Sequence, residues 1–168
     1  MDIQIASVTS EHAIQQVADL ATIIWHSTYD SLLPAGQVDY MLNKFQSKSA
    51  VFHQINEENH LYYLLVYQNE TVGFFAVRSQ YQSVGKLFLS KIYLASHARG
   101  KGIIRRAFAF IENLALENDC KQIWLTVNKE NLHAQEVYRH FGFHVIKSTV
   151  SDIGGGYVMD DYVFEKQI

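Results

Sequence analysis

The order of strand-like and helix-like patterns most constrains what this chain can fold into. A continuous apolar run over Leu61–Tyr67 has the length of a buried strand, and the apolar residues before it recur at helical spacing. Thr9 and Ser10 can cap the first of these helices. The elements expected before the run are a strand at 3–5, a helix that begins after Ser10 and ends before Pro34, and shorter helices over 37–45 and 49–56.

From this apolar run onward, strands come first as hairpins and then alternate with helices. The expected elements are strands over 61–67, 72–77 and 87–94, a helix over 104–115, a strand over 123–127, a helix over 132–140, and strands over 143–150 and 157–165. We expect a turn at Asn69–Glu70 and a flexible loop at the glycines 154–156. This order predicts an α/β fold of three layers, with a mixed, mostly antiparallel central sheet and helices on both faces.

Length and composition restrict the class of protein. A chain of 168 residues without repeats or linkers is expected to form a single domain over 1–168, and 48% hydrophobic residues exclude a disordered chain. The net charge of −3 argues against a general nucleic-acid-binding protein. The single cysteine, Cys120, excludes an intramolecular disulfide, and no apolar run approaches the roughly 20 residues of a membrane span. Without a signal-peptide pattern, we expect a cytoplasmic protein with no nucleic-acid or membrane partner; a homodimer stays open.

A glycine turn joins the strand over 87–94 to the helix that follows it. Its sequence is Arg99-Gly100-Lys101-Gly102-Ile103-Ile104. The first turn of a helix leaves backbone N–H groups unpaired, and glycine allows an anion to approach the backbone closely. Arg99 and Lys101 add positive charge, so this turn is a candidate site for a phosphate or pyrophosphate. The alternative is an ordinary strand-to-helix connection with two turn glycines.

A second pattern follows one helix later and consists of Asn131, Ala134, Tyr138, Gly142 and Phe143. The two patterns together resemble the GCN5-related N-acetyltransferase (GNAT) superfamily. The cofactor motif of that family has Gln or Arg first, Gly fourth, and Gly or Ala sixth.

This chain matches the cofactor motif at Arg99 and Gly102 and departs from it at Ile104. The Ile104 side chain either obstructs a pyrophosphate at the start of the helix or points into the core. The resemblance covers the whole chain and is most specific over Leu87–Phe143.

The resemblance implies acetyl-CoA as the co-substrate. Residues expected to bind it are Ile92, Tyr93 and Leu94 along the pantetheine arm, Arg99, Gly100, Lys101, Gly102, Ile103 and Ile104 at the pyrophosphate, and Asn131 and Ala134 beside the arm. Tyr138 is expected to act as the general acid for the departing thiolate, with a packed core tyrosine as the alternative. Asn131 is equally suited to cap a helix.

The acceptor is expected to be a small primary amine. Trp25 and Tyr29 are part of a weaker resemblance to a bacterial group that includes spermidine/spermine N-acetyltransferases, so a polyamine is one candidate. Asp160, Asp161 and Glu165 on the last strand are candidates for holding such a cation, with Asp160 as the expected contact; the alternative is a solvated, charged strand. Strand alternation places Asp160 and Asp161 on opposite faces, so at most one of them faces a given pocket. No carboxylate lies between Leu87 and Leu94, so the sequence identifies no general base.

The alternative to an enzyme is a non-catalytic acyl-CoA-binding or regulatory domain, which Ile104 and the missing base would suit. No metal site is expected, because His133, Glu136 and His140 share a helical face but lack a known ligand spacing.

Overall fold

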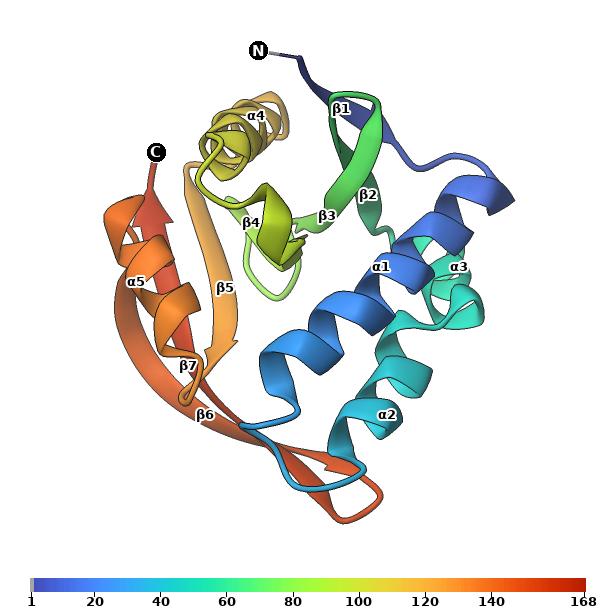
Figure 1. Cartoon of the computed structure of the whole chain (residues 1–168). Coiled ribbons are helices and arrows are strands. Elements are labelled where there is room, and N and C mark those ends of the chain that lie inside the picture. Colours follow the sequence, from blue (N-terminus) through green and yellow to red (C-terminus); the bar gives the residue numbers. More distant parts are fainter. Residues whose placement is uncertain (1) are drawn as a thin grey trace. The chain divides into compact units, whose positions relative to one another are not determined.

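The computed structural model describes residues 2–168, and Figure 1 shows its course. Within this range the strands form one seven-stranded sheet in the order β1-β2-β3-β4-β5-β7-β6. The β4–β5 pair is parallel, whereas β1–β2, β2–β3, β5–β7 and β6–β7 are antiparallel. The predicted fold class, a mixed and mostly antiparallel sheet combined with helices, is therefore confirmed.

The chain divides into two compact units. Unit 1 comprises the residues up to Arg78 together with Lys91–Ala109, and unit 2 comprises Ser79–Ser90 together with Phe110–Ile168. Strand β4 (Lys86–Leu94) and helix α4 (Ile103–Glu117) contribute residues to both units. The single domain expected over 1–168 remains a prediction.

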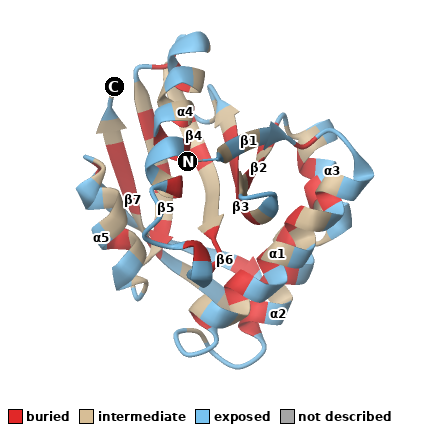
Figure 2. Ribbon diagram, turned by 45° about the horizontal axis from the view of Figure 1, so that its top comes forward, coloured by how far each residue is buried: buried red, intermediate tan, exposed pale blue. Residues whose placement is uncertain are grey.

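Unit 1 begins with β1 and continues through the helices of the N-terminal part. Its elements are β1 (Ile3–Ser7), α1 (Glu11–Tyr29), α2 (Gln37–Met41), a π-helical turn (Leu42–Gln46), α3 (Lys48–Glu57), β2 (Leu61–Tyr67) and β3 (Glu70–Ser79). The Ser10 hydroxyl accepts a hydrogen bond from the Ala13 N–H over 3.1 Å and caps α1 as predicted. Figure 2 shows buried and exposed positions alternating along α1.

Two details of unit 1 differ from the predictions. The helix expected over 37–45 is α-helical only to Met41 and continues as the π-helical turn. The turn between β2 and β3 is formed by Gln68 and Asn69, both with positive φ (50° and 66°), rather than by Asn69–Glu70. Two-residue hairpin turns favour positive φ at both central positions, which is why β3 already begins at Glu70.

Unit 2 contains the remaining strands and helix α5. Its further elements are β5 (Gln122–Asn128), α5 (Leu132–His140), β6 (His144–Gly154) and β7 (Tyr157–Gln167). The prediction of a flexible loop at the glycines 154–156 is wrong. Gly154 pairs with Tyr157, and Gly155 and Gly156 form a tight two-residue turn with φ of 62° and 79°. Strand β6 therefore extends beyond its expected end at residue 150.

The single thiol of the chain lies in unit 2. Cys120 is 1% exposed and follows the turn after α4. Its Sγ accepts a hydrogen bond from Gln80 Nε2 at 3.5 Å and donates one to the Asn118 carbonyl at 3.5 Å. Burial raises the pKa of this thiol above its usual range. The side chain is a small, enclosed packing residue.

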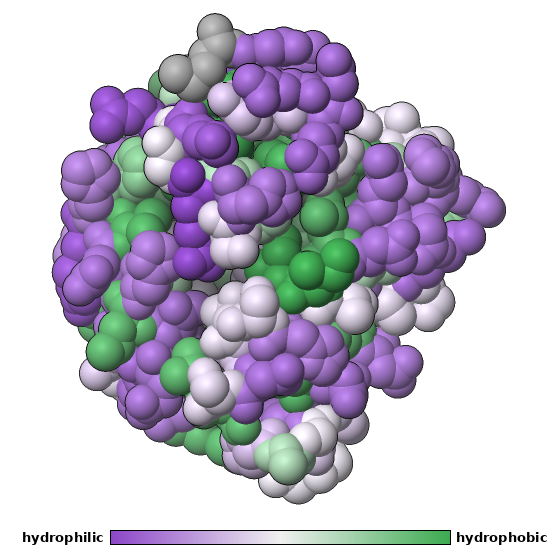
Figure 3. Space-filling view, in the orientation of Figure 1, coloured by the Kyte–Doolittle hydropathy of each residue, from purple (hydrophilic) through white to green (hydrophobic). Residues whose placement is uncertain are grey.

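The surface is largely polar on the face that Figure 3 shows, where purple hydrophilic residues surround smaller green apolar areas. None of the helices in residues 2–168 combines the length and apolar character needed to cross a membrane.

Candidate active site

The glycine turn in unit 1 is open and positively charged. Gly100 and Gly102 have φ of 73° and 76°, and a Cβ added at either would meet no heavy atom within 4 Å. The first α-helical hydrogen bond after the turn runs from the Arg106 N–H to the Gly102 carbonyl at 3.1 Å, so the preceding amides have no helical acceptor. Arg99 and Lys101 are exposed beside them. The turn therefore has the space, donors and charge that a pyrophosphate requires.

The first two residues of α4 are buried to different extents. Ile103 is 1% exposed and occupies the core position at the start of the helix. Ile104, for which a core position was one of two predictions, stays partly exposed next to the turn. The departure from the family motif therefore places a partly exposed apolar side chain at this helix start.

The end of β4 is held close to β3 by a glycine. A Cβ at Gly73 would lie 2.4 Å from the Tyr93 carbonyl oxygen, which real side chains essentially never allow. One residue beyond β4, the Ala95 N–H donates to the Val72 carbonyl at 2.8 Å. Gly73 thus allows the backbone at Tyr93 to lie close to β3. Sequence analysis did not single it out, because a lone glycine in a strand pattern carries little information.

Asn131 caps helix α5 in unit 2, which is one of the two roles predicted for this residue. Asn131 Oδ1 accepts a hydrogen bond from the Ala134 N–H over 3.1 Å. Buried Gln135 donates from Nε2 to the Asn128 carbonyl at 3.2 Å and to the Lys129 carbonyl at 2.8 Å. These bonds fix the loop between β5 and α5. A contact of Asn131 or Ala134 with a cofactor remains a prediction.

Tyr138 lies six residues after the start of α5 and is half-buried. Its ring centroid is 6.0 Å from that of Phe143 and 6.0 Å from that of Phe164. These contacts hold the ring by its sides and fix the direction of the phenol. Packing and proton donation are therefore compatible roles for this residue.

The aromatic residues expected to contact the acceptor lie together in unit 1. The Trp25 ring centroid is 5.2 Å from that of Tyr29 and 5.6 Å from that of Tyr93. Trp25 is 5% and Tyr29 is 8% exposed, and Trp25 Nε1 has no hydrogen-bond partner in residues 2–168. The structure therefore joins α1 to the end of β4 through an aromatic cluster.

The two neighbouring aspartates of β7 differ in exposure and in partners. Asp160 is 53% exposed, and its Oδ1 lies 2.7 Å from Lys129 Nζ. Asp161 is only 5% exposed. Burial raises the pKa of Asp161 to about 6, and the Asp160 charge acts in the same direction. The opposite orientation predicted from strand alternation agrees with this difference in burial.

The profile of the Acetyltransferase (GNAT) family matches residues 21–143 of the chain. This match covers well over half of the sequence, including the glycine turn, Asn131 and Tyr138. The chain belongs to the GNAT family.

Two curated acetyltransferases are similar in sequence to part of this chain. The chain is 32% identical over 85 residues to a probable spermine N(1)-acetyltransferase of Bacillus subtilis subsp. natto, which covers 47% of this chain and 56% of that protein. A spermine/spermidine N(1)-acetyltransferase of Bacillus subtilis is 31% identical over the same length. The chain thus spans about half the length of the curated relatives it matches.

Solved GNAT structures share the fold over the whole chain. The PaiA N-acetyltransferase of Thermoplasma acidophilum, solved with coenzyme A, has a TM-score of 0.79 at 20% identity, with 100% of both chains covered. A GCN5-related N-acetyltransferase of Rhodopseudomonas palustris has a TM-score of 0.82 at 12% identity, covering 100% of this chain and 97% of that one.

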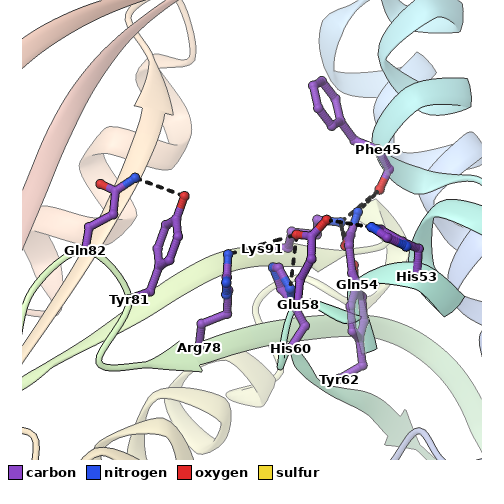
Figure 4. Close-up of polar contacts among 10 residues, drawn as sticks. All are labelled: Phe45, His53, Gln54, Glu58, His60, Tyr62, Arg78, Tyr81, Gln82 and Lys91. Atoms are coloured by element: carbon purple, nitrogen blue, oxygen red, sulfur yellow. Dashed lines mark hydrogen bonds and ion pairs between the residues drawn. The ribbon is translucent and has the colours of Figure 1, made fainter. Parts of the chain in front are cut away.

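Sequence analysis missed a polar cluster around Lys91 in unit 1 of this GNAT chain (Figure 4). Lys91 Nζ donates to the Phe45 carbonyl at 2.9 Å, to Gln54 Oε1 at 2.7 Å and to the Tyr62 hydroxyl. Gln54 Nε2 also donates to the Phe45 carbonyl at 2.9 Å, and Tyr62 donates to Gln54 Oε1 at 2.6 Å. The cluster ties the π-helical turn and α3 to β2 and β4. The sequence feature that could have revealed this cluster is a lysine inside an apolar strand.

Burial shifts the pKa values within this cluster. It lowers the pKa of Lys91 to about 7, although the Glu58 carboxylate acts in the opposite direction. Burial, followed by the charges of Lys91 and Arg78, lowers the pKa of His60 to about 4. Burial raises the pKa of Tyr62. Near neutral pH, Lys91 of the folded protein is therefore close to its pKa and only partly protonated.

The titration of Lys91 should appear in the stability of the protein. Between about pH 7 and its ordinary value of 10.5, unfolded Lys91 keeps a proton that folded Lys91 has released. Because the unfolded state then binds more protons, the free energy of unfolding is expected to rise with pH, by at most about 1.4 kcal/mol per pH unit. Denaturant unfolding across this range measures the slope.

Lys91→Met should flatten this slope, because it removes the titrating group and leaves the Tyr62–Gln54–Phe45 bonds in place. Lys48→Met, at an exposed lysine of the same unit, should leave the slope unchanged. Equal slopes in the wild type and Lys91→Met would contradict this account.

Potential metal ligands do not gather in the described structure. In residues 2–168 no group of three or more His, Cys, Asp or Glu side chains could hold a metal ion.

Proposed function

We propose that this chain is an acetyl-CoA-dependent N-acetyltransferase that transfers the acetyl group to a primary amine by direct attack. The observation that carries the proposal is the glycine turn before α4, where Gly100 and Gly102 leave open space beside unpaired amides. Family membership over residues 21–143 supports the same chemistry.

The proposed cofactor contacts follow the local geometry of each segment. Backbone groups of Ile92, Tyr93 and Leu94 pair with the pantetheine arm, at the end of β4 that approaches Gly73 closely. The amides from Gly100 to Ile104 bind the pyrophosphate, whereas the Arg99 N–H donates to the Ser96 carbonyl at 3.2 Å. The Arg99 and Lys101 side chains add positive charge. Asn131 and Ala134 contact the arm from the start of α5.

The proposed chemistry needs a stabilised oxyanion and an acid. A backbone N–H near Leu94 donates to the oxygen of the tetrahedral intermediate. Tyr138 gives its phenolic proton to the departing thiolate, because a phenol of pKa about 10 and a thiol of about 8.5 are matched closely enough for transfer.

A polyamine is the proposed acceptor class. Two curated relatives are named as spermine or spermine/spermidine acetyltransferases, and the matched region covers 47% of this chain. The residues proposed to contact the acceptor are Trp25, Tyr29 and Asp160. Aromatic rings and carboxylates both attract a multiply charged cation.

Mass detection of acetylated products and released CoA, with a panel of amines, tests the proposal. Spermidine is expected to have a lower KM than a neutral-tailed primary amine of similar length. The KM of spermidine should rise with added salt, because exposed charge pairs are screened within about 8–10 Å at ordinary ionic strength. Equal, salt-independent KM values would exclude the polyamine class and leave the acetyltransferase intact. Binding of acetyl-CoA without turnover of any amine would instead indicate a non-catalytic acyl-CoA-binding domain.

A further inference from the structure

His26 lies between two carboxylates where α1 meets α2. Its Nδ1 is 2.9 Å from Oδ1 and 3.0 Å from Oδ2 of Asp30, and its Nε2 is 2.9 Å from Oδ1 of Asp39. A neutral imidazole donates from only one nitrogen, and an ionised carboxylate only accepts, so the two contacts together require the imidazolium form. His26 is therefore a charged bridge between the end of α1 and α2, which lie side by side in Figure 1.

The surroundings of His26 favour this charged form. In residues 2–168, the charges that act on the ring are those of Asp30 and Asp39. The Asp30 hydrogen bond raises the pKa of His26 above its usual value of 6.5, although desolvation acts in the opposite direction. The carbonyl end of α1 also favours a positive charge in its last turn, where His26 lies.

The other elements packed against α1 direct their charges away from this bridge. Lys44 of the π-helical turn lies over two aromatic rings, at 5.7 Å and 5.4 Å from their centroids. Lys48 of α3 pairs with Glu11 at the opposite end of α1. His53 and Glu58, at α3 and its end, pair with each other at 3.4 Å. The protonation of His26 therefore depends on its two aspartates.

Helix α2 depends on contacts with neighbouring elements. It has only five residues, and its N-cap, Gly36, makes no side-chain hydrogen bond to it. A helix this short is not stable by itself. Val38 and Met41 are buried, and the bond between His26 and Asp39 adds a polar contact on the exposed side. The bridge therefore helps to fix α2 against the end of α1.

The same end of α1 carries the aromatic residues proposed to contact the acceptor. Trp25 directly precedes His26, and Tyr29 directly precedes Asp30. The Trp25 ring centroid lies 5.6 Å from that of Tyr93, in the β4 segment proposed to bind the pantetheine arm. All of these residues belong to unit 1. A displaced last turn of α1 would therefore move both acceptor-contacting rings relative to that segment.

We propose that the His26 imidazolium is a positioning residue for the acceptor site, which holds the last turn of α1 by bridging Asp30 and Asp39. This inference rests on the proposed acetyltransferase function and on its acceptor contacts. Loss of the ring proton leaves a donor for only one of the two carboxylates. The affinity for the amine is therefore expected to fall as the pH rises through the pKa of His26, which lies above 6.5.

An NMR titration of the histidine ring signals tests the bridge without any substrate. The pKa of His26 should lie above 6.5 in the wild type and should fall in both Asp30→Asn and Asp39→Asn. Each substitution keeps the shape of the side chain and removes one negative charge. A wild-type value at or below 6.5, or no change in either variant, would overturn the bridge.

Two substitutions of His26 test its role in acceptor binding. Arginine stays charged at every accessible pH and donates to both carboxylates, whereas glutamine carries no charge. With spermidine as the probe, or the amine that the wild type acetylates fastest, the ratio of the wild-type KM to that of His26→Arg should rise about threefold between about pH 6 and 9. The ionisation of the amine affects both proteins equally and cancels in this ratio. His26→Gln should have the higher KM of the two variants at low pH, and both should bind acetyl-CoA with the wild-type Kd.

His53→Gln is the matched control, because His53 is also an exposed histidine of unit 1 with a carboxylate partner, and it should keep the wild-type KM. A KM ratio that does not change with pH would overturn the positioning role and leave the proposed function standing. An equal loss of acetyl-CoA affinity in His26→Gln would also overturn it, since this would indicate a general structural role. Failure of both the wild type and His53→Gln to acetylate any amine would overturn the proposed function and the positioning role with it.

Discussion

Replacing Gly102 by glutamate is expected to abolish acetyl-CoA binding. The substitution puts a carboxylate into the open space beside the first turn of α4, where the proposed pyrophosphate would lie. Two negative groups would compete for the same amides. The affinity measured by calorimetry should fall at least about 100-fold, which corresponds to roughly 2.7 kcal/mol.

Gly102→Ala separates charge from backbone strain. Gly102 has a φ of 76°, so any side chain there is strained by about 1 kcal/mol or more. Alanine adds this strain without charge, and an added Cβ meets no neighbour. We expect Gly102→Ala to bind acetyl-CoA within about tenfold of the wild type. A folded Gly102→Glu variant with unchanged affinity would disprove the assignment of the pyrophosphate site.

Replacing Tyr138 by phenylalanine is expected to lower kcat by about 10²–10⁴-fold. The ring contacts with Phe143 and Phe164 remain, so the melting temperature should change little. The substitution removes the hydroxyl and its transferable proton. Steady-state kinetics with saturating acetyl-CoA measure the effect.

Tyr81→Phe is the corresponding control in unit 2. Its hydroxyl accepts a hydrogen bond from Gln82 Nε2 at 2.9 Å in an exposed turn, so its loss should leave kcat unchanged. If turnover of Tyr138→Phe stayed within twofold of the wild type, Tyr138 would be a packing residue.

The sequence predicts those elements whose boundaries depend on local chemistry. The apolar run over Leu61–Tyr67 coincides with β2, and the bounds of α5 are also as predicted, with Asn131 as its cap. Both ends of these two elements are marked by residues that lie next to them in the sequence. The π-helical turn after Met41 is different, because its residues suit an α-helix and the contacts of the Phe45 carbonyl with Lys91 and Gln54 come from distant segments.

The residues of the candidate site likewise divide into those that the local sequence predicts and those that depend on distant segments. Sequence motifs locate the glycine turn and Tyr138, because these residues follow one another at fixed spacing. They do not distinguish Asp160 from Asp161, since the difference arises from burial and from the pairing of Lys129 with one of them. They also miss Gly73, whose importance depends on the Tyr93 carbonyl of a neighbouring strand.

The enclosed position of Cys120 should keep the folded protein from reacting with thiol reagents. Because the chain has one cysteine and it is 1% exposed, a chromogenic disulfide reagent should react slowly with the native protein. Free CoA released during turnover can then be titrated continuously without a protein background. Reaction of Cys120 itself would report opening of the structure around it, and a cysteine introduced at an exposed position would accept a spectroscopic label at that position alone.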